Sequence, residues 1–181
     1  MKHGLIAVLG VCLFAATLSA EPYYPSGYYL GLNLGQGYSQ YPGTSATASN
    51  MFGRAYIGYN FSPYVGLDIG YLLLPTLKHD DHQLSNSGYT ANLRLVNPLS
   101  EGFSIYGQVG GAILTATEKS PAGDQRENAT VLTYGGGLDY VFANVGGLHM
   151  TLDYQRIAKM NDVNVASPSY DLYSLGVYYQ F

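Results

Sequence analysis

Apolar and polar residues alternate with a period of two along most of the chain. Near the end, for example, Leu175, Val177 and Tyr179 alternate with Gly176 and Tyr178. Successive side chains of a β-strand point to opposite faces, so this period predicts strands with one apolar face. Segments of about ten residues that follow the pattern predict eight strands, at 28–38, 52–61, 64–74, 89–96, 103–114, 131–142, 148–157 and 170–181.

The connections between these segments are alternately short and long. Short connections are predicted at 62–63, 97–102 and 143–147, and longer polar stretches at 39–51, 75–88, 115–130 and 158–169. An even number of strands with short turns on one side and long loops on the other is typical of outer-membrane barrels. The pattern therefore predicts an all-β fold, an eight-stranded antiparallel up-and-down transmembrane β-barrel.

Composition decides which face of the barrel points outward. Charged residues make up only 11% of the chain, compared with about 25% in an average soluble domain. A soluble barrel would expose a face made largely of glycine with few charges, so we expect the apolar face to contact lipid. Aromatic residues near both ends of this face predict two interfacial girdles. The short-turn girdle comprises Tyr59, Phe61, Phe103, Tyr140, Phe142, Tyr179 and Phe181, and the long-loop girdle comprises Tyr38, Tyr71, Tyr89, Tyr134, Tyr154 and Tyr173.

The first 20 residues have the features of a secretory signal peptide. Lys2 precedes an apolar stretch at 5–18, which is shorter than the ~20 residues that a spanning helix needs. We expect 1–20 to be removed, by cleavage after Ala20 or Ser19, which leaves 21–27 as a periplasmic N-terminal segment and 28–181 as the barrel domain. Because the only cysteine, Cys12, lies in the signal peptide, we expect no disulfide and no thiolate metal site.

By the same parity, a set of charged residues points into the predicted barrel. The set is Arg54, Asp68, Arg94, Asp139 and Asp153. Removing one partner of a buried ion pair leaves the other charge unpaired at high cost, so we expect these side chains to pair with one another. A barrel of about eight strands is only wide enough inside for side chains. The set therefore predicts a plugged interior, and an ion path through the barrel is the alternative.

Chemistry-bearing residues in the predicted loops are few. His79, Asp80, Asp81 and His82 offer imidazole and carboxylate ligands, but they form no closed ligand set, so we expect neither a metal nor a cofactor. Cations near the long-loop side are candidates for contact with lipopolysaccharide phosphates. They are Lys78, Lys119, Arg126 and Lys159. The formal net charge of −4 and the lack of a basic cluster argue against nucleic acid as a partner.

A catalytic interpretation requires a nucleophile, a base and an orienting acid within reach of one another. His149, Thr151 and Asp153 alternate on one predicted inward face. Small lipid A deacylase barrels resemble each other through a His-x-Ser element on the lipid side, whereas the third residue here is an inward threonine. We therefore expect the protein not to be an enzyme.

Five segments carry a more specific pattern. They are YLGLNLG at 29–35, GYNFSPYVGLDIGY at 58–71, SIYGQVGGA at 104–112, GGGLDY at 135–140 and SLGVYYQF at 174–181. In this order and spacing they resemble the OmpA-like outer-membrane β-barrel domain of Gram-negative bacteria. The resemblance implies an integral outer-membrane location without the periplasmic peptidoglycan-binding domain of the full-length namesake. It also implies an assembly signal in the last strand, formed by Tyr173, Leu175, Val177, Tyr179 and Phe181.

Together these features predict an outer-membrane protein with a structural and surface-interaction role. The expected partners are outer-membrane lipid, lipopolysaccharide, the barrel-assembly machinery and an extracellular ligand bound by the loops at 39–51, 75–88, 115–130 and 158–169. Polar loops on a rigid scaffold are where binding usually resides. The alternatives are a narrow low-conductance channel and, less favoured, a lipid A-modifying enzyme.

Overall fold

The computed structural model describes residues 26–40, 47–74, 77–79, 82–100, 102–120, 123–142, 144–158 and 169–181. Its strands are β1 (Gly27–Gln40), β2 (Thr47–Ser62), β3 (Val65–Leu73), β4 (Leu77–His79), β5 (His82–Ser100), β6 (Phe103–Ser120), β7 (Gly123–Val141), β8 (Leu148–Ile157) and β9 (Ser169–Gln180). The predicted signal peptide at 1–20 lies outside the described residues, as does most of the segment at 21–27. No helix in the described part of the chain is long and apolar enough to cross a membrane.

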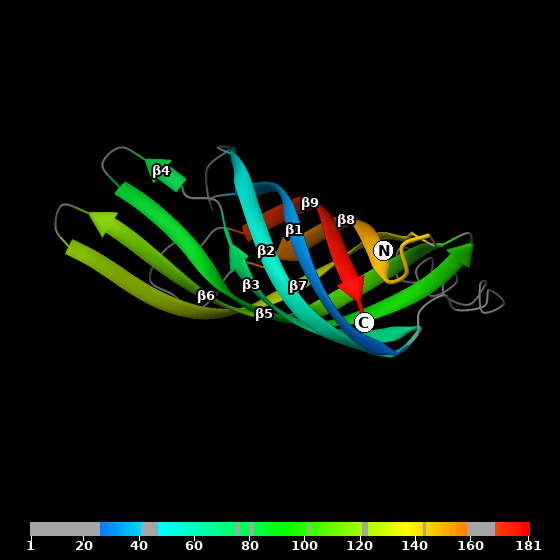
Figure 1. Ribbon diagram of the computed structural model, residues 1–181. Coiled ribbons are helices and arrows are strands. Elements are labelled where there is room, and N and C mark those ends of the chain that lie inside the picture. The colour runs from blue at the N-terminus through cyan, green and yellow to red at the C-terminus, as the bar shows by residue number, and fades with distance from the viewer. Residues whose placement is uncertain are drawn as a thin grey trace, which may run out of the picture.

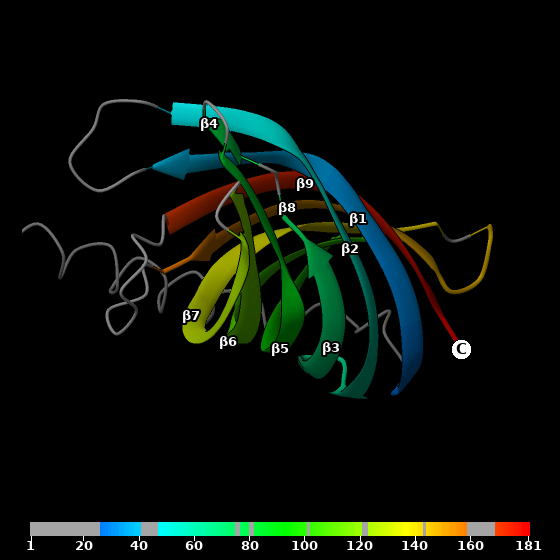
Figure 2. The same cartoon turned by 90° about the vertical axis from the view of Figure 1, so that its left-hand side faces the viewer.

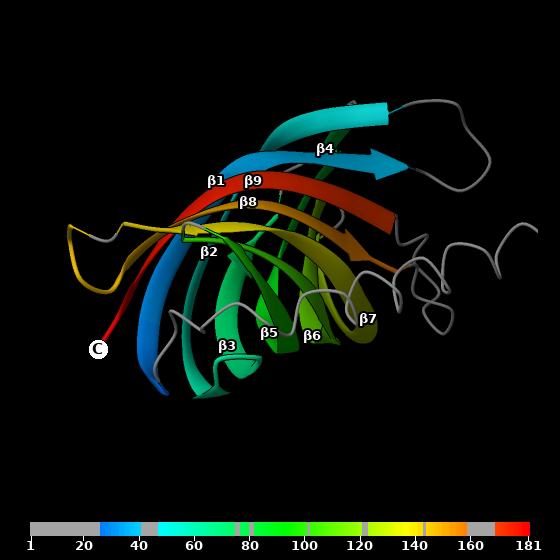
Figure 3. The same cartoon turned by 90° about the vertical axis from the view of Figure 1, so that its right-hand side faces the viewer.

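Eight of these strands form one closed antiparallel barrel (Figures 2 and 3). They are hydrogen-bonded in the order β3-β2-β1-β9-β8-β7-β6-β5, and the pairing of β3 with β5 closes the ring. The first and last strands meet along most of their length, from Tyr29 opposite Gln180 to Gln40 opposite Ser169. The structure confirms the predicted eight-stranded up-and-down barrel and adds the three-residue strand β4, which pairs with the start of β5.

Alternate side chains point to the outside and to the interior of the barrel, as the sequence pattern predicts. On β1, Leu30, Leu32 and Leu34 are each more than half exposed, whereas the intervening Asn33 is buried. Because the exposed leucines would be unfavourable in water, this face is the one that contacts lipid.

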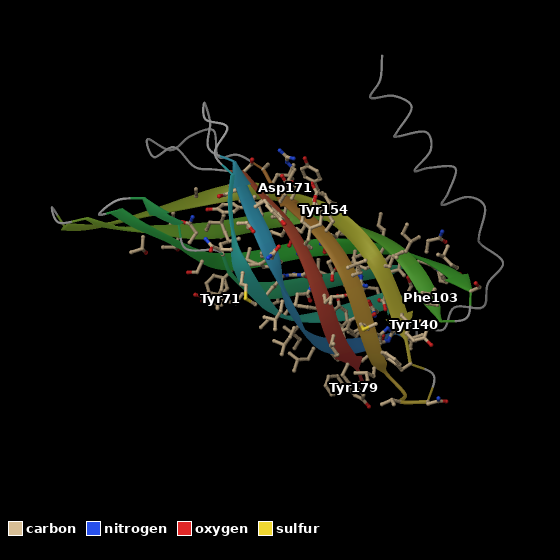
Figure 4. The ribbon with its side chains drawn as sticks, turned by 90° about the horizontal axis from the view of Figure 1, so that it is seen from above. Tyr71, Phe103, Tyr140, Tyr154, Asp171 and Tyr179 are labelled. Atoms are coloured by element: carbon tan, nitrogen blue, oxygen red, sulfur yellow. The ribbon has the colours of Figure 1, made fainter. Side chains whose placement is uncertain are left out.

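Aromatic side chains gather at both ends of this outward face (Figure 4). Phe103 and Tyr140 lie toward the short-turn end, whereas Tyr71 and Tyr154 lie toward the long-loop end. The ring centroids of Phe103 and Tyr140 are 4.6 Å apart, and those of Tyr71 and Tyr89 are 5.3 Å apart. Members of each predicted girdle therefore contact one another across neighbouring strands, in the arrangement that suits the two membrane interfaces.

Short turns join the strands at one end of the barrel. The turn predicted at 97–102 is shorter than expected, because β5 continues to Ser100. Pro98 lacks an N–H group for the ladder, and a register shift between Pro98 and Ser100 accommodates it within the strand. Gly102 and Gly147, with φ of 83° and 82°, supply the left-handed backbone that two of these turns need.

At the other end, two stretches predicted as loops are mostly strand. The stretch 75–88 holds β4 and the start of β5, and the stretch 115–130 holds the end of β6 and the start of β7. A polar composition predicts loop, but a hairpin that projects beyond the bilayer needs no apolar outer face, and Thr115 Oγ1 donates to Asn128 Oδ1 at 2.8 Å. The loop prediction was therefore wrong for most of these residues. Figure 1 shows both hairpins projecting past the ends of β1 and β9.

Two other predicted loops connect β1 to β2 and β8 to β9. The first is shorter than predicted, and most residues of the second are not among those that the structure describes. Of the stretch 39–51, only 41–46 separates β1 from β2, and these residues are outside the described part. The stretch 158–169 does separate β8 from β9, but 159–168 is likewise outside the described part.

Candidate functional site

Among the described residues, the barrel interior contains two buried arginine–aspartate ion pairs, of which the first joins β2 to β3. Arg54 pairs with Asp68, and both side chains are almost inaccessible. Arg54 Nε donates to Thr90 Oγ1 at 3.2 Å, and the Asn92 amide donates to Asp68 Oδ1 at 3.2 Å. Polar groups of β5 thus complete the hydrogen bonding of both charges, which a buried ion pair requires.

The second ion pair joins β5 to β7 on the inner side of the intervening β6. Arg94 Nη2 lies 2.7 Å from Asp139 Oδ2. Asp139 also lies 3.1 Å from His149 Nδ1 and accepts a hydrogen bond from the Tyr178 hydroxyl at 2.5 Å. The His149 ring stacks on the Tyr178 ring, with centroids 4.2 Å apart. Side chains from β5, β8 and β9 therefore converge on a single carboxylate of β7.

The fifth predicted charge, Asp153, is bound by neutral groups. Its Oδ2 atom accepts hydrogen bonds from Asn33 Nδ2 at 2.9 Å and from Thr151 Oγ1 at 2.5 Å. Asn33 Nδ2 also lies 3.3 Å from Ser174 Oγ. The predicted interior charges are thus brought together as two ion pairs and one separate carboxylate, and not as a single network.

Interior tyrosines, which stand at inward positions of the alternation, pack against both arginines. The guanidinium carbon of Arg94 lies 3.8 Å from the ring centroid of Tyr106 and 5.2 Å from that of Tyr178. The guanidinium carbon of Arg54 lies 4.8 Å from the ring centroid of Tyr56. Such contacts stabilise a desolvated cation. Parity would have found these rings, since Tyr56 stands two positions after the inward Arg54.

A second layer of the interior is apolar and lies toward the long-loop end. Its buried side chains are Phe52, Leu72, Leu74, Ala112, Leu114, Val131, Ile157, Tyr170 and Leu172. Phe52 precedes Arg54 on β2, and Leu72 follows Asp68 on β3, so both lie nearer to the long loops than the ion pairs do. At this end of the barrel, apolar packing fills the lumen.

A small polar cavity remains beside the ion pairs. Its volume is about 10 Å³, and it is lined by Asn33, Arg54, Tyr56, Asp68, Arg94, Tyr106, Gln108 and Asp153. Space of this size is about that of one water molecule. The cavity does not have the dimensions of an aqueous pore.

The residues considered for catalysis are divided between two carboxylates. The Thr151 hydroxyl donates to Asp153, whereas His149 faces Asp139. All of these side chains lie inside the filled barrel and away from the lipid face.

The residues considered for metal binding and for lipopolysaccharide lie largely outside the description. His79 and His82 are cross-strand neighbours in the β4–β5 hairpin, but their side chains are not described. Asp80, Asp81 and Lys159 lie outside the described residues, as do the side chains of Lys78, Lys119 and Arg126. Within the described part of the chain, no group of three or more His, Cys, Asp or Glu residues could hold a metal ion.

The outward face of β9 presents the row that the resemblance identifies as an assembly signal. Leu175, Val177 and Phe181 are half exposed or more, and the rings of Tyr179 and Phe181 lie 5.2 Å apart. The Phe181 N–H donates to the Tyr28 carbonyl at 2.8 Å, so the end of the chain joins the start of β1.

A closed barrel with an apolar outer band, two aromatic girdles and a filled interior defines a transmembrane β-barrel of the outer-membrane type. Residues 5–181 match the family model described as outer membrane protein beta-barrel domain. The chain belongs to this family, and it is an integral protein of the bacterial outer membrane.

Curated relatives are outer membrane protein A from enterobacteria. The chain is 28% identical over 200 residues to the protein of Shigella flexneri and 29% identical over 197 residues to that of Escherichia coli O157:H7. These alignments cover 100% of this chain but 56% and 55% of the relatives. The chain therefore spans about half the length of the curated relatives it matches, and the predicted resemblance is confirmed.

Solved structures with the same fold are small outer-membrane barrels. Neisserial surface protein A superimposes with a TM-score of 0.74 at 14% identity, covering 87% of this chain and 100% of its own. Ail, the attachment invasion locus protein of Yersinia pestis, superimposes with a TM-score of 0.62 at 18% identity, over 87% of this chain and 100% of its own. At these identities the likeness shows the fold.

Proposed function

We propose that this protein is a non-conducting outer-membrane scaffold that presents an extracellular binding surface. The filled lumen carries the proposal: the described interior holds the Arg54–Asp68 and Arg94–Asp139 ion pairs, and an apolar layer lies nearer to the long loops. A chain selected to pass ions would need a continuous polar path. An interior packed like a protein core instead supports a rigid frame for the parts outside the membrane.

The proposed binding surface is formed by the long-loop side. The β4–β5 and β6–β7 hairpins project there, at the end of the barrel where β1 ends and β9 begins. Rigid projecting hairpins hold side chains in fixed positions at lower entropic cost than flexible loops do. We propose that an extracellular ligand binds this surface and that lipopolysaccharide surrounds its base.

The experiment that tests the role is a deletion strain compared with its parent in three assays. We expect reduced surface adhesion, unchanged permeability to small solutes and unchanged lipid A mass. A loss of permeability would favour the channel, and a changed lipid A mass would favour an enzyme. Either result, with adhesion unchanged, would overturn the proposal.

Planar bilayers test the closed lumen directly. Purified wild-type protein should show little or no steady conductance, because the apolar layer spans the lumen above the ion pairs. Folding of the sample is checked by the difference in gel migration between unboiled and boiled protein. A large, stable and ion-selective conductance from folded protein would establish the channel alternative.

The orientation is tested by epitope tags. A tag inserted at Gly123, in the β6–β7 hairpin, should react with antibody on intact cells, because long connections of outer-membrane barrels are extracellular. A tag beside Gly146, in the turn between β7 and β8, should react only after the outer membrane is permeabilised. The reverse pattern of labelling would invert the orientation.

We also propose that the outward row of β9 is read by the barrel-assembly machinery. Deleting Phe181 should lower the amount of protein in the outer membrane and increase periplasmic degradation, as measured by fractionation at native expression. Replacing Phe181 with Tyr retains an aromatic ring and is the matched control. Equal insertion of the deletion variant and the wild type would contradict the proposal.

A further inference from the structure

The lipid-facing surface of the barrel is hollowed over β2, β3, β5 and β6. A groove of about 680 Å³ lies there, and its lining is almost wholly apolar. Tyr71 and Tyr89, which belong to the long-loop girdle, form its rim. Leu30 and Ile57 also line the groove, two positions from the Tyr28–Tyr59 pair near the short-turn end, so the groove runs along much of the hydrocarbon band.

Small outward residues form the floor of the groove. Ala91 pairs across strands with Gly111 on one side and with Ile69 on the other. Ala55 on β2 pairs with Tyr71 on β3. Because large side chains stand beside small ones on the same face, the surface dips between them, whereas a uniform row of leucines would make it level.

The groove is deep because its floor residues have small side chains. The backbone beneath them leaves room for larger ones. A Cβ atom built on Gly111 would meet nothing closer than the Val131 carbonyl at 3.7 Å, which is an ordinary contact. Many inward glycines lack this room, since a Cβ on Gly110 would lie 2.0 Å from the Ala91 carbonyl. A larger residue would therefore fit at Gly111, and its side chain would fill the groove.

We propose that this groove binds one acyl chain of a bilayer lipid. The groove is continuous with the surface that the barrel presents to hydrocarbon, so its occupant comes from the bilayer. Walls such as Ile69 and Ile113, with almost no polar lining, suit a flexible hydrocarbon chain. Between apolar surfaces in a membrane, close van der Waals packing decides the preferred contact, and a concave site gives a chain more contacts than a convex one.

Photocrosslinking in vesicles tests this site. Full-length barrel is refolded in phosphatidylcholine vesicles that contain phosphatidylcholine with a diazirine on the acyl chain, and crosslinked peptides are mapped by mass spectrometry. Gly111→Leu fills the groove. Gly107→Leu is the matched control, because Gly107 is an outward glycine of β6 outside the groove, where a Cβ meets nothing closer than 4.0 Å.

In wild-type protein and in Gly107→Leu, crosslinks should concentrate on peptides that contain Ile69, Ala91 and Gly111. In Gly111→Leu their yield there should fall about tenfold, which corresponds to about 1.4 kcal/mol. Folding of each variant is checked by gel migration, and Ala91→Leu replaces Gly111→Leu if the latter does not fold. Crosslinks spread evenly around β1 to β9, an equal yield in Gly111→Leu, or protein–protein adducts in place of lipid adducts would each overturn the proposal.

Discussion

Replacing Arg94 with Met should destabilise the barrel by about 3 to 5 kcal/mol, the cost of leaving a buried charge without its partner. Arg94 is buried, and it contacts both the Asp139 carboxylate at 2.7 Å and the face of the Tyr106 ring at 3.8 Å. Met fills part of the same volume but carries no charge, so Asp139 keeps only the hydrogen bonds from His149 and Tyr178. The free energy of unfolding is measured by urea titration in lipid vesicles.

Two further variants test whether the loss of stability in Arg94→Met comes from the unpaired buried charge or from the substitution of any arginine. Arg156→Met is the matched control, since Arg156 pairs with Asp171 at 3.2 Å near the long-loop girdle, where its side chain is 35% exposed. A partly exposed pair contributes less than a buried one, and the loss there should stay below about 1 kcal/mol. The double change Arg94→Met with Asp139→Asn removes both charges and keeps an acceptor for Tyr178. It should cost less than Arg94→Met alone.

Equal effects of Arg94→Met and Arg156→Met would show that the interior pair is hydrated and that the lumen is not closed. A larger loss in the double variant than in Arg94→Met would show that hydrogen bonding, and not the unpaired charge, dominates at this site. Both outcomes would remove the physical basis for the plugged interior.

The sequence predicts the barrel because its alternation is coupled to the environment of each face. Leu30, Leu32 and Leu34 are outward in the structure, as their parity indicates, because the lipid face tolerates only apolar side chains along its whole height. The same parity places Arg54 and Asp68 inside, where they meet. Because the lipid face requires an apolar side chain at every second residue, the alternation is visible in one sequence without any alignment.

Other features escape prediction because their signals are ambiguous. Leu72 is apolar and inward, and a leucine of either parity is compatible with a barrel whose lumen is partly dry. Tyrosine serves both the girdles and the interior, so composition does not distinguish Tyr71 from Tyr56, and only their parity along the strands does. The projecting hairpins have the composition of loops because both of their faces leave the bilayer, and the requirement for an apolar row ends there.

The pairing of interior charges depends on which strands face one another across the lumen, which parity does not give. Arg94 and Asp139 lie on β5 and β7, two strands apart in the ring, and their contact depends on the register of β6 with both neighbours. Asp153 has the same parity and charge as Asp139, but Asn33 and Thr151 surround it. Only the closed barrel shows which carboxylate each arginine meets.

The rings of the interior tyrosines fit only because glycine stands opposite them on neighbouring strands. Substituting such a glycine should therefore lower the stability of the barrel substantially. We expect Gly31→Ala to destabilise the barrel by about 1 to 3 kcal/mol, as overpacking of a filled core does. A Cβ atom on Gly31 would lie 2.4 Å from Cζ of Tyr56 and 2.7 Å from Cβ of Tyr178. Tyr56 would have to move, and its ring packs against the guanidinium of Arg54.

Gly107→Ala is the control for this substitution. A Cβ there meets nothing closer than 4.0 Å, so the change should be neutral or should stabilise the fold by up to about 1 kcal/mol through the unfolded chain. Combining Gly31→Ala with Tyr56→Leu removes the ring that blocks the methyl group, so the double variant should cost less than the sum of the single changes. Additive losses in urea titrations, or equal stability of Gly31→Ala and Gly107→Ala, would mean that the lumen has room to spare. A lumen with such room would no longer be closed by the packing of Tyr56 against Arg54, and the non-conducting scaffold would lose one of its two supporting layers.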